Sequence, residues 1–255
     1  MKVIILAGGL GTRISEYTKS IPKPMILVNK TPILVHIMKH FYRYSFNEFI
    51  IAIGYKGELI QKYFKKNKFK NWKVDVVKTG KNTMTGGRLK RLEKLLSKNK
   101  EFFLTYGDGV SNIDLNKLLK FHNKHNKIAT ISTVRPPARF GFIKLNKNKV
   151  NCFREKSSLD KGWINGGFML ISKNIINYLH LGELEDQVIP AIASLNLVSA
   201  YKHQGFWIAM NNYKEFLELD SIYNENKISD FIDDLKILYT LVELTKFLIC
   251  SLKKR

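Results

Sequence analysis

The chain of 255 residues is predicted to form an α/β fold in which a mixed, mostly parallel sheet is flanked by helices. Short apolar runs alternate with segments of helical periodicity over its first half, an order typical of parallel sheets. The first run, residues 2–7, is rich in β-branched residues and ends in glycines, as a buried strand does. Hydrophobic residues make up 45% of the chain, which is enough for one large core.

The elements of the first half follow from these two periodicities. Strands are expected where short apolar runs end in glycine or polar residues, and helices where apolar residues recur every three or four positions. Ile33, Ile37 and Phe41 recur in this way, and Thr31 precedes them as a candidate N-cap. The predicted strands are residues 2–7, 49–53, 72–78, 101–105 and 128–134, and the predicted helices are residues 32–46, 55–64, 88–96 and 114–125.

The pattern changes after Arg135, where PPARFG predicts a turn-rich hinge. Strand-like runs follow without intervening helices, which favours a smaller antiparallel part of the same domain. A helix is then expected that bends or restarts at Pro190, followed by strand-like segments and a long C-terminal helix capped by Ser229. The antiparallel strands are predicted at residues 142–145, 150–153 and 167–171, and the helix around Pro190 at residues 184–195. The later strand-like segments are predicted within residues 197–210, and the last helix at residues 228–255.

The charge balance favours a small anionic ligand. Lys and Arg number 43 against 21 Asp and Glu, giving a net charge of +22. The lysines are spread along the chain without a dominant block, so we expect no nucleic-acid partner. Cys152 and Cys250 are far apart, and no apolar run approaches the length of a membrane span. Since Met1 leads directly into a strand, a cytoplasmic protein with no membrane association is expected.

A glycine-rich turn follows the first strand. Gly8, Gly9 and Gly11 let backbone N–H groups converge on a phosphate chain, and Arg13 and Lys23 supply positive charge. The spacing matches neither GxxxxGK[ST] nor GxGxxG. The glycines alone are equally compatible with an ordinary tight turn beside two solvated basic residues.

Four sequence blocks carry a family resemblance. They are LAGGLGTR with PKPM, TGKNTMTGGRLKR at 79–91, FLTYGDG at 103–109 and FREKSSLDKGWINGGFML at 153–170. In this order they resemble the sugar-1-phosphate nucleotidylyltransferase family, and TGGRLKR most resembles its glucose-1-phosphate cytidylyltransferases. The resemblance implies a Rossmann-like nucleotidyltransferase domain at 1–225, with a nucleotide-binding half at 1–135 and a sugar-phosphate-binding half at 136–225. Residues 226–255 would be a C-terminal helical appendage.

The resemblance also implies a reaction and a set of site residues. A nucleoside triphosphate, with CTP favoured, would react with a sugar 1-phosphate, with glucose 1-phosphate favoured, to give a nucleotide sugar and pyrophosphate. Arg13 would contact the leaving pyrophosphate and Lys23 the α-phosphate, while Lys156 would hold the sugar phosphate. The remaining binding residues would be Leu6, Ala7, Gly8, Gly9, Gly11, Thr12, Thr83, Arg88, Gly107, Glu155, Asn165, Gly166 and Gly167. A homo-oligomer is expected, with the last helix packed on the body or on a second subunit.

A metal site is predicted at Asp108. A carboxylate flanked by glycines at a strand end suits Mg2+, although Asp-Gly also forms ordinary turns. By resemblance, Asn211 stands where the family carries a second metal-binding Asp. Asn keeps a carbonyl oxygen and loses the charge. Either Asp108 and the substrate phosphates suffice, or activity is impaired and the chain is a non-catalytic nucleotide- or sugar-phosphate-binding paralogue.

Overall fold

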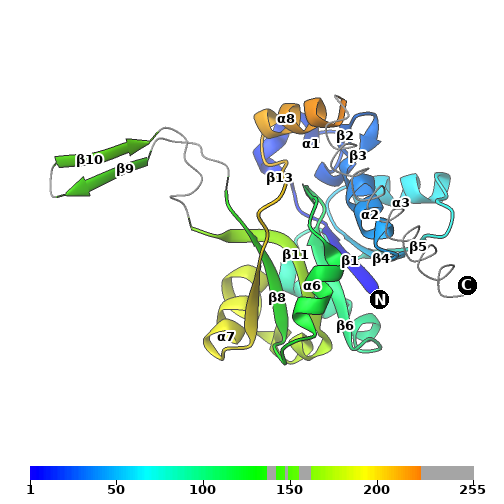
Figure 1. Cartoon of the computed structure of the whole chain (residues 1–255). Helices are drawn as coiled ribbons and strands as arrows, with labels where there is room; N and C mark the ends of the chain where they lie inside the picture. The colour runs from blue at the N-terminus through cyan, green and yellow to red at the C-terminus, as the bar shows by residue number, and fades with distance from the viewer. Residues whose placement is uncertain (137–141, 147–148, 155–161, 225–255) are drawn as a thin grey trace, which may run out of the picture.

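The computed structural model describes residues 1–136, 142–146, 149–154 and 162–224. In this part of the chain, the centre is a seven-stranded sheet of order β12-β8-β11-β6-β1-β4-β5 (Figure 1). Strand β11 runs antiparallel to β6 and β8, and the other neighbours are parallel. The predicted α/β class with a mixed, mostly parallel sheet is confirmed. The strands are β1 (Lys2–Ala7), β4 (Glu48–Ile53), β5 (Lys73–Lys78), β6 (Glu101–Tyr106), β8 (Ala129–Val134), β11 (Ile164–Ser172) and β12 (Val198–Lys202).

Helices cover both faces of this sheet, which explains the unbroken apolar run of β1. Val3 and Ile5 belong to the core on one face, whereas Ile4 and Leu6 belong to the core on the other. A strand buried on both sides has no solvent face, so its sequence need not alternate. The first face is covered by α2 (Ile33–Arg43), α3 (Gly57–Lys66) and α6 (Leu115–His122), and the second by α4 (Thr85–Arg91), α5 (Glu93–Leu96) and α7 (Ile189–Ser194).

The start of α2 differs from the prediction. Thr31 does not cap the helix, because it pairs with Val28 in the hairpin of β2 (Leu27–Val28) and β3 (Thr31–Pro32), and Pro32 takes the N-cap position. Asn29 and Lys30 both have positive φ, as a two-residue hairpin turn requires. Thr31 therefore belongs to the hairpin and is not available as the N-cap of α2.

The helix predicted at 88–96 begins earlier and is interrupted. It starts at Thr85 and leaves helical geometry at Leu92 before α5 continues. Glycine has low helix propensity, so Gly86 argued against a helix here. In the fold, a Cβ on Gly86 would lie 1.8 Å from the carbonyl oxygen of Gly182. Close packing against that backbone therefore outweighs the propensity.

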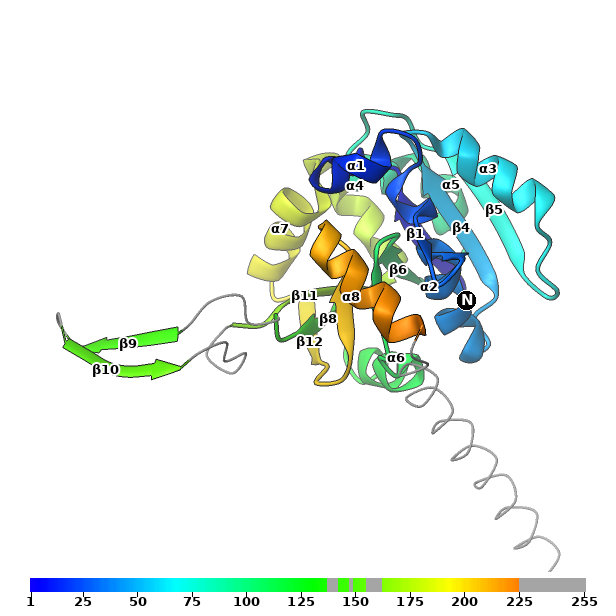
Figure 2. The ribbon, with the colours of Figure 1, turned by 90° about the horizontal axis from the view of Figure 1, so that it is seen from above.

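The second half contains further departures. The strand predicted at 167–171 is part of β11 in the central sheet, so the antiparallel part is smaller than expected. Two helices were not predicted, η4 (Lys173–Leu181) and α8 (Tyr213–Asn224), and the segment predicted at 184–195 is a π-helical turn, η5 (Leu184–Val188), followed by α7. The hairpin of β9 (Phe142–Asn146) and β10 (Lys149–Arg154) stands away from the sheet (Figure 2). Short strands β7 (Gly109–Ser111) and β13 (Trp207–Ala209) pair with each other.

Some predictions fall outside the described residues. The C-terminal helix expected at 228–255 and the site residues Glu155 and Lys156 are among them. Of the helices that the structure describes, none combines the length and the apolar character that crossing a membrane requires.

Burial of histidine predicts acid sensitivity of the fold. His40 lies in α2 within the core, its Nε2 has no hydrogen-bond partner among the described residues, and burial lowers its pKa to about 3. Burial likewise lowers the pKa of His122 to about 4. The unfolded chain binds these protons near the ordinary pKa of about 6.5 and the folded chain does not, so stability falls as the pH falls below that value.

We expect the free energy of unfolding to drop by on the order of 2 kcal/mol per buried histidine between pH 7.5 and pH 5. His40→Gln removes one titrating group, so urea unfolding of this variant should show a correspondingly smaller pH dependence. His180→Gln, a change at an exposed histidine, should leave the pH dependence unaltered. An identical pH dependence in His40→Gln and the unmodified chain would contradict this account.

Candidate active site

A cleft of about 710 Å³ lies where the parallel strands of the sheet end. Its walls include the turns that follow β1 and β6, the segment before α4, and the start of β11. Because β11 is antiparallel to its neighbours, its first residues reach the edge at which those strands finish. Ligands of open α/β sheets collect at this edge.

All predicted site residues within the described part of the chain line this cleft, and the role of each stays a prediction. They are Leu6, Ala7, Gly8, Gly9, Gly11, Thr12, Arg13, Lys23, Thr83, Arg88, Gly107, Asp108, Asn165, Gly166 and Gly167. Lining residues that were not predicted include Met84 and Trp207. The Trp207 indole N–H donates to the Gly166 carbonyl at 2.7 Å, a contact between strands that sequence spacing does not reveal.

The glycine-rich turn is shaped by two different requirements. Gly11 has φ +68°, and its carbonyl accepts hydrogen bonds from the Ile14 amide and the Thr18 hydroxyl, each at 3.1 Å. Gly8 instead makes room, since a Cβ there would lie 2.2 Å from the Arg88 guanidinium. Gly9 has no neighbouring atom within 4 Å of such a Cβ, so it faces open space.

Arg88 holds three loops together at the floor of the cleft. Its buried guanidinium contacts the carbonyls of Gly8 at 2.8 Å, Gly80 at 2.9 Å and Ile53 at 3.3 Å, and the Thr79 hydroxyl at 2.7 Å. Ile53 is the last residue of β4, Gly8 follows β1, and Thr79 and Gly80 follow β5, so one side chain fixes the ends of three strands. Its donors point largely to the protein, and its predicted contact with a nucleotide remains a prediction.

We expect Arg88→Lys to lower the free energy of unfolding by about 2–4 kcal/mol, because a single ammonium cannot satisfy carbonyls on three loops. Thermal unfolding measures this loss, and nucleotide affinity should fall with it. Arg91→Lys is a matched control, since among the described residues the Arg91 side chain donates only to the Thr79 carbonyl, at 2.6 Å, and its replacement should cost less. Equal losses in the two variants would argue against the bracing role.

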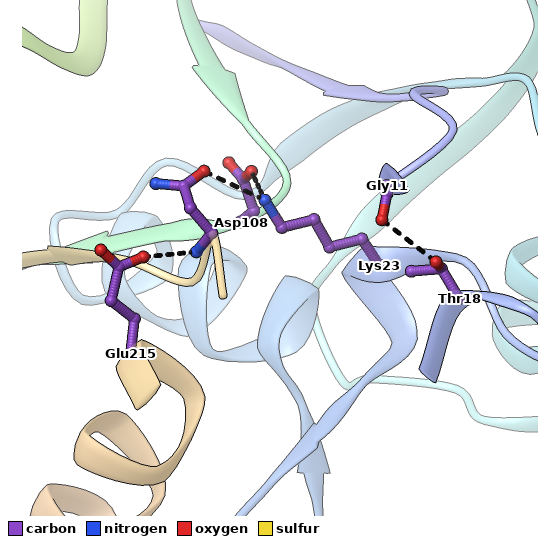
Figure 3. Close-up of polar contacts among 6 residues, drawn as sticks. Gly11, Thr18, Lys23, Asp108 and Glu215 are labelled. Atoms are coloured by element: carbon purple, nitrogen blue, oxygen red, sulfur yellow. Dashed lines mark hydrogen bonds and ion pairs between the residues drawn. The ribbon is translucent and has the colours of Figure 1, made fainter. Parts of the chain in front are cut away.

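Lys23, Asp108 and Asn211 meet at the cleft, and Figure 3 shows the Lys23 side chain pointing to Asp108. The Lys23 Nζ lies 2.5 Å from a carboxylate oxygen of Asp108 and 3.3 Å from the side-chain oxygen of Asn211. The Lys23 side chain is 11% exposed and that of Asp108 is 28% exposed, so this ion pair is partly shielded from water. An ammonium therefore stands where the two oxygens converge.

The position of Asn211 is fixed by the backbone around it. The Met210 amide donates to the Asp108 carbonyl at 2.9 Å, and the Asn211 amide donates to the Glu215 carboxylate at 2.7 Å. These bonds place Asn211 beside Asp108, although 103 positions separate them in the sequence. A carboxylate and an amide oxygen converging on one cation fit a hard divalent ion such as Mg2+.

A hydrogen-bonded network connects Tyr106, Asn165 and Thr85, which line the cleft, to two carboxylates behind its wall. The Tyr106 hydroxyl donates to Glu185 at 2.5 Å, and the Asn165 amide donates to the Tyr106 oxygen at 3.5 Å. Thr85, at the first position of α4, donates its hydroxyl to Glu185 and Glu183. Its hydroxyl is therefore already engaged by the protein, while Thr83 lines the cleft nearby.

The fold and this cleft together define an α/β protein whose glycine-rich turn, Arg13 and Lys23 line a cleft at the strand ends. A family model described as nucleotidyl transferase matches residues 2–226, and the chain belongs to that family. The predicted family is thus confirmed. The glucose-1-phosphate cytidylyltransferase of Salmonella typhimurium is 35% identical over 250 residues, covering 89% of this chain and 97% of that protein.

More distant relatives and solved structures agree on the fold. The mannose-1-phosphate guanylyltransferase catalytic subunit beta of Xenopus tropicalis is 27% identical over 226 residues, covering 85% of this chain and 63% of that protein. HddC from Yersinia pseudotuberculosis, solved with GMP-PN, is 25% identical with a TM-score of 0.65, covering 87% of this chain and 99% of that chain. UDP-glucose pyrophosphorylase from Acinetobacter baumanii gives a TM-score of 0.69 at 18% identity, covering 92% and 99%.

Proposed function

We propose that the chain transfers a nucleotidyl group from CTP to glucose 1-phosphate, giving CDP-glucose and pyrophosphate. The observation that carries this proposal is the convergence of the glycine turn, Lys23 and Asp108 on one cleft, in a chain 35% identical to a glucose-1-phosphate cytidylyltransferase. In the reaction, an oxygen of the sugar phosphate attacks the α-phosphorus of CTP. The bond between the α-phosphorus and the oxygen of the leaving pyrophosphate breaks as a new phosphoanhydride bond forms between the cytidylyl group and the sugar phosphate, and no protein nucleophile is needed.

Each cationic residue has a proposed role in positioning charge. Lys23 neutralises the α-phosphate, and Arg13, exposed at the cleft, contacts the leaving pyrophosphate. Lys156, with Glu155 beside it in sequence, holds the sugar phosphate. Asp108 and the Asn211 oxygen would hold Mg2+ together with the substrate phosphates. When bound, this ion would neutralise charge on those phosphates.

The Lys23–Asp108 ion pair has a consequence for binding order. While Lys23 is bound to Asp108, the ammonium and a divalent cation compete for the same carboxylate. A bound nucleotide offers Lys23 phosphate oxygens instead, which releases Asp108. We therefore expect Mg2+ and nucleotide to bind cooperatively, each favouring the other.

A second candidate is a paralogue that binds nucleotide without turnover, favoured by the neutral Asn211 beside Asp108. Incubating the protein with each nucleoside triphosphate in turn, Mg2+ and glucose 1-phosphate, while following pyrophosphate release, separates the two. Release with CTP supports the proposed reaction. Binding of CTP without release favours the paralogue, and absence of nucleotide binding contradicts both. Light scattering tests the homo-oligomer, which we propose on the basis of the family alone.

A further inference from the structure

Three polar side chains behind the β11 side of the cleft form a chain of matched donors and acceptors. Glu185, on η5, accepts a hydrogen bond from the Tyr106 hydroxyl, with the two oxygens 2.5 Å apart. The Tyr106 oxygen is then left as an acceptor, and the Asn165 Nδ2 donates to it at 3.5 Å. The Gly167 amide donates to the Asn165 Oδ1 at 2.8 Å, which fixes the orientation of the Asn165 amide, because a backbone N–H must face an oxygen.

We propose that Glu185 and Tyr106 are positioning residues that hold the Asn165 amide so that it donates a hydrogen bond to an oxygen of the sugar 1-phosphate. This inference rests on the proposed function. Asn165 and Tyr106 line the cleft, whereas Glu185 is not part of its wall. One Nδ2 hydrogen of Asn165 is used by Tyr106, and the second has no partner among the described residues, so it can donate to a ligand.

Packing around Tyr106 and Glu185 holds these hydrogen-bonded side chains in place. Gly167 has φ +79°, and a Cβ there would lie 2.9 Å from the Tyr106 ring, so the ring packs directly on this backbone. Leu184 and Val188, buried on η5, anchor the turn that carries Glu185.

The arrangement also predicts that mutations in this network affect the two substrates differently. Removing Glu185 deprives Tyr106 of its acceptor, but the Thr85 hydroxyl keeps a second acceptor in Glu183, at 3.2 Å. The first residue of α4, which follows the segment predicted to contact the nucleotide, therefore keeps a hydrogen bond to Glu183, the residue before η5. Loss of Glu185 or of the Tyr106 hydroxyl should weaken recognition of the sugar phosphate and leave recognition of CTP nearly unaltered.

The test is calorimetric binding of CTP and of CDP-glucose, with KM measured for each substrate. In Tyr106→Phe and Glu185→Ala, we expect the Kd for CDP-glucose and the KM for glucose 1-phosphate to rise about three- to tenfold, the value of one lost hydrogen bond. The Kd for CTP should change less than about twofold. Glu185→Gln keeps an acceptor oxygen and should restore most of the affinity. The variant that combines Tyr106→Phe with Glu185→Ala should bind CDP-glucose no more weakly than Tyr106→Phe alone, because Glu185 acts through Tyr106.

Matched controls are Tyr63→Phe on α3 and Asp186→Ala, an exposed carboxylate on the same turn as Glu185; both should bind as the unmodified protein does. Unchanged CDP-glucose affinity in Tyr106→Phe and Glu185→Ala overturns the inference, as does an equal loss of CTP affinity. If the unmodified protein binds CDP-glucose without turnover, the catalytic proposal fails while the positioning role is still measured. If it binds neither ligand, both proposals fail.

Discussion

Arg13→Ala and Lys23→Ala should each lower the rate of pyrophosphate release by about a hundredfold to a thousandfold, while the protein stays folded. Losing one preorganised donor to a developing negative charge raises the barrier by roughly 2.7–4 kcal/mol. Arg13 is exposed, and Lys23 lies at the start of a short 3-10 turn (Lys23–Met25), outside the apolar core. The measurement is kcat with saturating CTP and glucose 1-phosphate, accompanied by thermal unfolding.

Lys19→Ala is the control for this experiment. Lys19 is exposed four residues before Lys23 and does not line the cleft, so its removal changes the net charge equally without touching the site. Its kcat should remain within about twofold of the unmodified value. If Arg13→Ala and Lys23→Ala both lose less than about tenfold, neither side chain stabilises the transition state by the amount proposed.

Asp108→Asn should abolish turnover, and Asn211→Asp should lower the Mg2+ concentration needed for half-maximal activity by roughly tenfold, on the order of 1.4 kcal/mol. Asp108 is the carboxylate that meets the Lys23 ammonium, and Asn211 contributes the neighbouring oxygen. A second carboxylate attracts a divalent ion more strongly than it attracts a single ammonium. If the natural protein is inactive, Asn211→Asp should create activity.

A metal titration without nucleotide gives a readout that does not depend on turnover. Lys23→Ala removes the competing ammonium, so calorimetry should show tighter Mg2+ binding in this variant than in the unmodified protein. Asp108→Asn should bind Mg2+ more weakly than either. If Asn211→Asp leaves the Mg2+ dependence unchanged while Asp108→Asn abolishes turnover, Asn211 does not contribute to the metal site, despite its contact with Lys23.

The strands and their glycine-rich ends could be predicted because their signals are local. An apolar run of six residues and the turn after it need no knowledge of distant contacts, and β1, β4 and β6 lie within a residue of their predicted bounds. The helix α8 was missed, because Leu219 is its single fully buried residue and its apolar periodicity is weak. One of its hydrogen bonds to the body, from the Asn29 amide to the Asp220 carboxylate at 2.7 Å, joins residues far apart in sequence.

The sequence by itself determined the fold class, the family and most of the motif residues that line the cleft, since each depends on motifs contained in a short stretch. Tertiary structure alone decided what those side chains touch. Lys23 meets Asp108, Arg88 meets three loops, and Asn165 reaches Glu185 through Tyr106. Such contacts depend on how strands are ordered in the sheet and on the reversed direction of β11. Contacts between residues far apart in sequence decide the strand order and the direction of β11, and the local pattern of apolar residues does not reveal those contacts.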